Sequence, residues 1–273
     1  MITVEDERYL VDLCEEAAEA IMSYYRGTYE TTTKEDRSPL TEADRASHRL
    51  IVSALKKRWP DIPVVSEEGL LVDFGKRKAW NYFWLVDPLD GTKEFIHGDD
   101  EFTVNIALIE GTKPFFGIVY VPVTKRAYIG HRERGAYLIQ NGSKIPLRAS
   151  SNWHKERFKV AVSRSHLDSH TRAFLEHFKD LCEPVVRGSS LKFCSVAEGS
   201  VDFYLRFGPT WEWDTAAGQA VVEAAGGSVL TIPSDKDLTY NKPDLKNGPF
   251  IVLSGREAYL KSPFRKWIGS REL

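Results

Sequence analysis

The sequence reads Tyr82-Phe-Trp-Leu-Val-Asp87-Pro-Leu-Asp90-Gly-Thr92 at its most informative point, where five aromatic and aliphatic residues lead into two aspartates. Such a continuous apolar run predicts a β-strand that is buried on both faces. Pro88 fixes its own φ angle and biases Asp87 toward an extended backbone, so both carboxylates can turn toward one point beyond the strand end. Gly91 and Thr92 then begin a predicted helical turn, whose free N–H groups suit a phosphate oxygen.

Acidic residues gather in comparable settings elsewhere in the chain. Glu67 directly follows a predicted strand over 62–66, and Asp214 stands at a predicted helix start after Gly208-Pro209. Each has a structural interpretation as well: Asp214 as a helix cap, Asp87 to Asp90 as a turn, and Glu67 as a solvated loop acid. Two like charges about 4 Å apart repel by roughly 4 kcal/mol at an effective dielectric near 20, so clustered acids share protons or bind a cation. Ligands that are all oxygen favour Mg²⁺ over zinc.

The rest of the chain indicates two differently built halves. Thr3 and Asp6 predict a capped helix that runs to Gly27, and a second helix starts at Thr41 and ends before Pro60. Alternating segments over 102–139 and a turn at 141–142 predict an antiparallel meander. Strands and helices alternate after the polar stretch at 148–157. We therefore expect an α+β domain over 1–150 with most metal ligands, and an α/β domain over 151–273 that contributes Asp214 and nucleotide contacts.

Composition excludes several classes of protein. The 273 residues are 42% hydrophobic and 28% charged with a formal net charge of −2, which argues against disorder and against a polynucleotide-binding partner. No apolar run approaches the ~20 residues of a membrane span, and the acidic first residues lack the basic region of a signal peptide. Three cysteines without a C-x-x-C pair indicate reduced packing residues. We expect a soluble cytoplasmic protein; peripheral attachment to the inner membrane and the choice between monomer and homodimer stay open.

Three segments together resemble a known enzyme family. Glu67-Glu68, Asp87-Pro-Leu-Asp90-Gly-Thr92 and Trp213-Asp214-Thr215-Ala216-Ala217 are similar to signature elements of the Mg²⁺-dependent, lithium-sensitive phosphatases that include inositol monophosphatase and fructose-1,6-bisphosphatase. The order and spacing of these segments match those of the family's signature elements over nearly the whole chain. The resemblance implies a layered α-β-α-β-α sandwich, α+β in its first half and α/β in its second.

The resemblance also implies roles for individual residues. It implies two or three Mg²⁺ ions, with these ligands: Glu67, Asp87, the Leu89 carbonyl, Asp90 and Asp214. Thr92, linked to Asp44, would orient the attacking water, and Glu67 would share in catalysis. Asp44 also fits a plain capping box with Thr41. The implied substrate contacts are Glu67, Leu89, Asp90, Gly91, Thr92, Ser189, Lys192, Arg206 and Asp214.

Within this family, the segments at 90–96, 102–108 and 192–199 resemble the 3′(2′),5′-bisphosphate nucleotidases. This likeness implies hydrolysis of adenosine 3′,5′-bisphosphate to AMP and phosphate, which clears a by-product of sulfate activation, and acceptance of the phosphosulfate form. A second phosphate needs cations, for which Lys192 and Arg206 are candidates, although exposed basic residues are often only solvated. Two alternatives stay open: a phosphatase acting on inositol phosphate or histidinol phosphate, and a non-catalytic module that binds metal and nucleotide.

Overall fold

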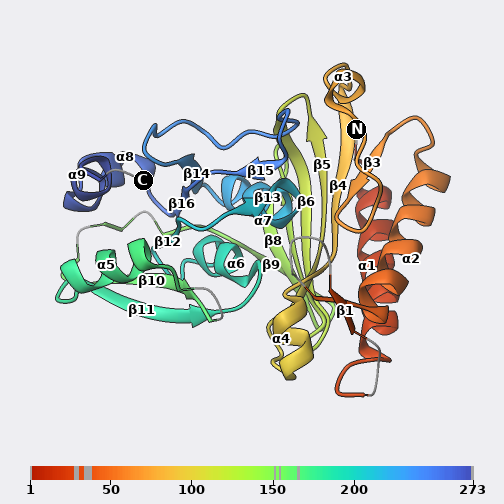
Figure 1. Cartoon of the computed structure of the whole chain (residues 1–273), viewed down its shortest axis with the longest axis horizontal. Coiled ribbons are helices and arrows are strands. Elements are labelled where there is room, and N and C mark those ends of the chain that lie inside the picture. Colours follow the sequence, from red (N-terminus) through yellow and green to blue (C-terminus); the bar gives the residue numbers. More distant parts are fainter. Residues whose placement is uncertain are drawn as a thin grey trace.

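The protein is built of alternating layers of helix and sheet (Figure 1), seen in a computed structural model that describes residues 2–27, 31–33, 39–150, 152–153, 155–164 and 167–271. The first layer holds α1 (Val4–Met22) and α2 (Glu42–Arg58). Both begin at the predicted capping boxes, with Asp6 and Asp44 as the acidic partners. The prediction that α1 reaches Gly27 is wrong, because the helix gives way to turns in which Arg26 takes a φ of 58°.

A seven-stranded mixed sheet forms the second layer. Its order is β3 (Val64–Ser66), β4 (Tyr82–Asp90), β5 (Thr103–Glu110), β6 (Lys113–Val121), β7 (Arg126–His131), β8 (Gly135–Gln140) and β9 (Ser143–Pro146). β3 is parallel to β4, and β4 is antiparallel to β5. Strands β5 to β9 form the antiparallel meander that the sequence predicted. Asn141 and Gly142 close the last hairpin with φ angles of 50° and 73°.

Strand β4 extends further than predicted. We expected the two aspartates to lie beyond the strand end, whereas β4 includes both and shifts its pairing register against β5 between Asp87 and Asp90. Pro88 lacks a backbone N–H and cannot continue the regular ladder, which accounts for the irregularity. The bend therefore presents both acids near the end of β4, beside β5.

The middle layer contains α6 (Leu191–Ala197) and α7 (Glu212–Ala224), which lie between the two sheets. Although α7 comes from the second half of the chain, it packs on β5, β6 and β7 of the first sheet. Two glycines permit this close approach. A Cβ added at Gly130 would lie 2.3 Å from the Ala220 carbonyl oxygen, and one at Gly117 would lie 2.7 Å from the Ala217 carbonyl oxygen.

The second sheet and an outer set of helices complete the fold. The sheet order is β11 (Cys182–Arg187), β10 (Phe158–Ser163), β12 (Phe203–Arg206), β16 (Phe250–Leu253) and β14 (Ser228–Thr231), with β10 parallel to both neighbours and β16 antiparallel to both of its own. Helices α5 (Ser169–His177), α8 (Arg256–Leu260) and α9 (Pro263–Gly269) cover its far face. Three apolar cores fill the spaces between the layers, which confirms the predicted layered α/β fold.

Short elements connect these layers. They are β1 (Thr31–Thr33), β2 (Pro39–Thr41), α3 (Phe74–Arg77), α4 (Thr92–His97), β13 (Thr210–Trp211) and β15 (Lys246–Asn247). Cys14, Cys182 and Cys194 are buried and unpaired, as predicted. Within the described ranges, every helix is too short or too polar to cross a membrane.

Candidate active site

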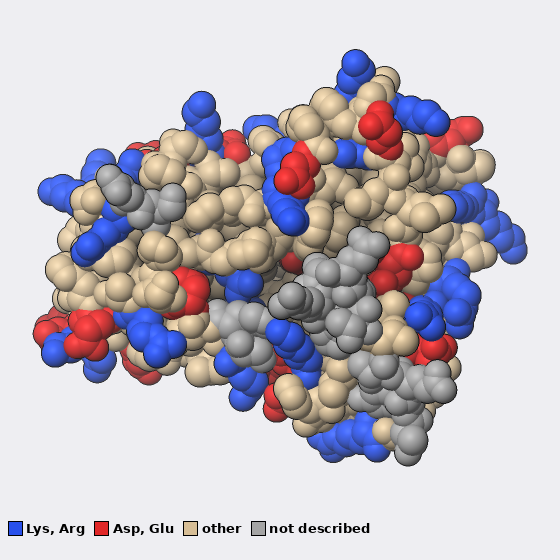
Figure 2. All heavy atoms as spheres, in the orientation of Figure 1, with Lys and Arg blue, Asp and Glu red and all other residues tan. Residues whose placement is uncertain are grey.

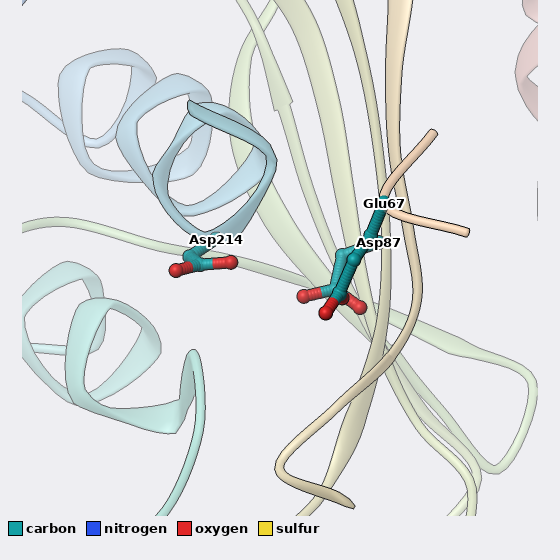
Figure 3. Close-up of side chains that lie close together, drawn as sticks. All are labelled: Glu67, Asp87 and Asp214. Atoms are coloured by element: carbon teal, nitrogen blue, oxygen red, sulfur yellow. The ribbon is translucent and has the colours of Figure 1, made fainter. Parts of the chain in front are cut away.

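Three acids from separate elements meet where β4 approaches the start of α7 (Figure 3). Carboxylate oxygens of Glu67, Asp87 and Asp214 lie within 4.8 Å of one another. Parallel pairing of β3 and β4 sets Ser66 beside Val86, and the Glu67 N–H donates to the Val86 carbonyl oxygen at 3.1 Å. Glu67 and Asp87 are consequently neighbours, and the packing of α7 on the first sheet brings Asp214 to them.

The prediction that Asp214 opens its helix is wrong. It is the third residue of α7, and its Oδ2 accepts a hydrogen bond from the Trp211 N–H at 2.8 Å. A side chain at this position can turn back over the helix start, so it both satisfies a free N–H group and reaches the other acids. The structural and the ligand interpretations of Asp214 are therefore compatible.

The acidic cluster is unfavourable without a counter-charge. Burial raises the pKa of Asp87, and the nearby charges of Glu67, Asp90 and Asp214 raise it further. Burial likewise raises the pKa of Asp214, with Asp90 and Glu67 adding to the effect. A divalent cation would offset this repulsion, and three carboxylates without nitrogen or sulfur donors suit a hard ion such as Mg²⁺. The residues present therefore fit the implied metal.

Asp90 lies outside this set of three and has its own polar surroundings. Its Oδ2 is 2.6 Å from Ser189 Oγ and 2.9 Å from Ser190 Oγ, and Asn105 Nδ2 donates to it at 3.4 Å. Ser190 Oγ is also 3.2 Å from the Asp214 carbonyl oxygen. Sequence reasoning missed Asn105 and the role of Ser190, because nothing along the chain links them to an acid more than ten residues away.

Thr92 and Asp44 meet as predicted. Thr92 Oγ1 donates to Asp44 Oδ1 at 3.1 Å, while the N–H and hydroxyl of Thr41 donate to Asp44 Oδ2 at 2.8 and 2.6 Å. The two interpretations of Asp44 thus hold together, because each carboxylate oxygen serves one of them. Asp44 is 1% exposed and lies behind Thr92.

Hydrogen bonds also hold the bend of β4 in place. The Leu89 N–H donates to Asp87 Oδ1 at 3.1 Å, and the hydroxyl of Ser47 in α2 donates to the Pro88 carbonyl oxygen at 2.7 Å. Gly91 takes a φ of 92°, a left-handed conformation that favours glycine, and precedes α4 directly. The backbone that presents Asp87 and Thr92 is therefore fixed from both sides.

A cleft of about 810 Å³ opens over the acids and has a volume typical of small-molecule sites. It is lined by every predicted site residue except Asp44: Glu67, Asp87, Leu89, Asp90, Gly91, Thr92, Ser189, Lys192, Arg206 and Asp214. Figure 2 draws one face of the molecule in the orientation of Figure 1. Lys and Arg side chains lie in the middle of the drawn face, between the parts of the molecule that hold α5 and α2. The cleft thus combines acidic and basic walls.

Lys192 is buried in the wall of this cleft. Its side chain is therefore not simply solvated at the surface, which was the alternative for this residue. Its Nζ donates to the Ser189 carbonyl oxygen at 2.7 Å and lies 5.4 Å from the ring centre of Tyr204. Burial lowers its pKa to about 8 despite the opposing effect of Asp90. Arg206 is half-buried nearby and donates from Nε to the Gly208 carbonyl oxygen at 3.2 Å.

Comparison with known proteins extends these observations. The model of the inositol monophosphatase family matches residues 5–260. The 3′(2′),5′-bisphosphate nucleotidase CysQ of Escherichia coli K12 is 44% identical over 219 residues, 80% of this chain and 87% of the relative. CysQ from Bacteroides thetaiotaomicron, described as a bacterial member of the inositol monophosphatase family, superposes with a TM-score of 0.78 at 39% identity, covering 89% and 94% of the two chains. An IMPase of Thermotoga maritima gives a TM-score of 0.81 at 25% identity, covering 97% of each chain.

Proposed function

This chain belongs to the inositol monophosphatase family, and we propose that it is a 3′(2′),5′-bisphosphate nucleotidase that releases the 3′-phosphate of adenosine 3′,5′-bisphosphate. The meeting of Glu67, Asp87 and Asp214 supports a phosphomonoesterase site. The choice of substrate rests on the relatives that carry this enzyme name and are 44 and 45% identical over 80% of the chain. The phosphosulfate form of the nucleotide is a second expected substrate.

We propose that the cation is Mg²⁺ and that two or three ions bind. Glu67, Asp87 and the Leu89 carbonyl oxygen would hold one ion, and Asp87, Asp90 and Asp214 another. When bound, Mg²⁺ supplies positive charge that favours deprotonation of water and offsets the charge of the phosphate. Ser189 and Ser190 hold the Asp90 carboxylate at 2.6 and 2.9 Å, so they are positioning residues in this scheme.

Thr92 and Asp44 would orient the attacking water. Because the Thr92 hydroxyl donates its hydrogen bond to Asp44, the lone pairs of its oxygen can accept a hydrogen bond from a water in the cleft. Such a water is held for in-line attack at phosphorus, and catalysis of this kind depends mainly on positioning and charge. Gly91 and Thr92 would contact the phosphate that is cleaved.

The second phosphate of the nucleotide needs cations beyond the metal site. Lys192 is 6% exposed and is oriented by the Ser189 carbonyl oxygen, so its ammonium group is held in the wall of the cleft. Arg206 can add a second charge from the end of β12. We propose that these two residues bind the 5′-phosphate.

Cleft residues come from both parts of the chain, with Asp87 before residue 150 and Lys192 after it. We propose that the parts 1–150 and 151–273 both contribute to the site, which lies between them. We also propose that the enzyme acts in the cytoplasm, where the by-product of sulfate activation arises, as a monomer or homodimer.

Phosphate release with Mg²⁺ tests the proposed function. The measurement compares kcat/KM for adenosine 3′,5′-bisphosphate, AMP, inositol 1-phosphate and fructose 1,6-bisphosphate. We expect the first to be the best substrate and lithium to inhibit its turnover. A flat profile, or a preference for inositol 1-phosphate, would contradict the assignment.

A further inference from the structure

We propose that Trp211 is the surface on which the nucleobase of the substrate stacks, an inference that rests on the proposed function. The indole of Trp211 is half-buried and lines the same cleft as Asp87 and Asp214. Its own backbone N–H donates to Asp214 Oδ2 at 2.8 Å, so the ring is attached immediately beside the acidic cluster. In a nucleoside 3′-phosphate, one sugar ring separates the phosphate from the base, which matches this arrangement.

The orientation of the indole is fixed before any ligand binds. Trp211 and Trp213 stack with their ring centres 5.1 Å apart and their planes 10° from parallel, and Trp213 is itself 4% exposed. The Trp211 carbonyl oxygen accepts a hydrogen bond from Asn247 Nδ2 at 2.9 Å, which ties β13 to β15. A rigid aromatic surface loses little conformational entropy on binding, and bases stack well on such surfaces.

Lys246 covers the ring. It pairs directly with Trp211 across the β13–β15 ribbon, and its Nζ lies 5.0 Å from the centre of the indole. Because the Lys246 side chain is exposed and flexible, an incoming base can displace it at small cost. The displaced ammonium group stays in the cleft, where it can contact a phosphate of the same ligand.

This arrangement gives the site a means of distinguishing nucleotides from phosphorylated sugars and polyols. The acids and Thr92 contact only the phosphate that is cleaved, which all these compounds share. Stacking on Trp211 adds binding energy only for a ligand that carries a flat aromatic group. Because every base has such a face, we expect a preference for nucleotides with little discrimination among bases.

The test compares adenosine 3′,5′-bisphosphate with a base-free analogue, 1,4-anhydroribitol 3,5-bisphosphate, in the wild type and in Trp211→Ala and Trp211→Phe. We expect the wild type to prefer the nucleotide by about tenfold or more in kcat/KM, mostly through KM. Trp211→Ala should remove most of that preference, and Trp211→Phe should keep part of it because an aromatic face remains. Trp80→Ala, at a half-buried tryptophan that is not among the lining residues of the cleft, should leave the preference unchanged.

The outcomes separate this inference from the proposed function. If Trp211→Ala lowers turnover of both compounds equally, or changes neither, the indole does not bind the base and the inference is wrong. It is also wrong if the wild type shows no preference for the nucleotide over its base-free analogue. If the wild type hydrolyses neither compound, the proposed nucleotidase activity itself fails.

Discussion

Thr92 Oγ1 lies 3.1 Å from Asp44 Oδ1, although 48 positions separate the two residues in the chain. The contact joins the start of α4 to the first turn of α2. Helix α4 follows β4, the strand that carries Asp87 and Asp90. It uses the one carboxylate oxygen that the capping box with Thr41 leaves for it. Helix capping and the proposed orientation of water therefore depend on a single side chain.

Removing the Thr92 hydroxyl should impair turnover far more than binding. We expect Thr92→Val to lower kcat about 100-fold with little change in KM, because the water loses its acceptor. Thr92→Ser keeps the hydroxyl and should retain most of kcat. Steady-state phosphate release measures both values. Equal losses in the two variants would contradict this role, because the hydroxyl that Thr92→Ser keeps would then give no advantage.

Asp44 can be compared with Asp6, which caps α1 in the same way. In Asp44→Asn one acceptor oxygen becomes a donor, so the residue can no longer accept from both Thr41 and Thr92. We expect a large fall in kcat together with a loss of helix stability of about 1 kcal/mol. Asp6→Asn should show the loss of stability alone, measured by urea unfolding. A comparable fall in kcat for both variants would exclude a catalytic role of Asp44.

Asp87→Asn should abolish phosphate release and leave the fold intact. Asp87 is 1% exposed among other acids, and loss of its charge relieves repulsion while removing a metal ligand. In chelator, we expect its Tm to equal or exceed that of the wild type, and added Mg²⁺ should raise its Tm less than it raises the Tm of the wild type. Asp168→Asn, at an acid that lines the cleft and caps α5, should keep the full response to Mg²⁺. Retained turnover in Asp87→Asn would contradict the proposed mechanism.

The affinity for the bisphosphate should decline above about pH 8. Burial lowers the pKa of Lys192 to about 8, so its ammonium group loses its proton as the pH rises through that value. We expect KM for adenosine 3′,5′-bisphosphate to increase from pH 7.5 to 9.5, while KM for adenosine 3′-phosphate, which lacks the second phosphate, changes less. Lys192→Met should have a high KM for the bisphosphate at every pH. The same rise in KM for both nucleotides would contradict a role for Lys192 at the 5′-phosphate.

The same pKa shift makes an opposite prediction for stability. Because the lowered pKa means that the folded state binds fewer protons than the unfolded chain between about pH 8 and the ordinary value of 10.5, the Lys192 contribution to stability should increase with pH across that range. Urea unfolding of the wild type and Lys192→Met at pH 8 and pH 10 isolates this contribution. The free energy of unfolding of the wild type, relative to that of Lys192→Met, should be higher at pH 10 than at pH 8.

Gly130→Ala should destabilise the protein by about 1–3 kcal/mol or more, because the added Cβ would lie 2.3 Å from the Ala220 carbonyl oxygen in α7. Moving α7 also moves Asp214, so we expect weaker activation by Mg²⁺. Gly248→Ala is the matched control, since a Cβ at that position meets no atom within 4 Å. Urea unfolding and Mg²⁺ titration of activity measure the two effects. Equal stability of both variants would contradict the close packing of α7.

Much of the fold was predictable because its signals are local. The capping boxes at Thr3 and Thr41, the continuous apolar run of β4, and the turn at Asn141 each arise from residues a few positions apart. The end of α1 and the start of α7 were placed wrongly, because helix ends depend on turns and tertiary packing that short patterns do not contain. The register shift in β4 was missed although Pro88 gives a local cause for it, because we took the proline to end the strand.

The sequence by itself determined which elements form and which acids stand at their ends, since apolar runs, proline and capping residues act over a few positions. Tertiary structure alone decided that Asp90 is held by Ser189, Ser190 and Asn105, that Lys192 is buried, and that Trp211 lines the cleft. Those relationships depend on how α6, α7 and the β13–β15 ribbon pack on the first sheet. Contacts between residues tens of positions apart follow from this packing, and short sequence patterns do not predict how elements pack.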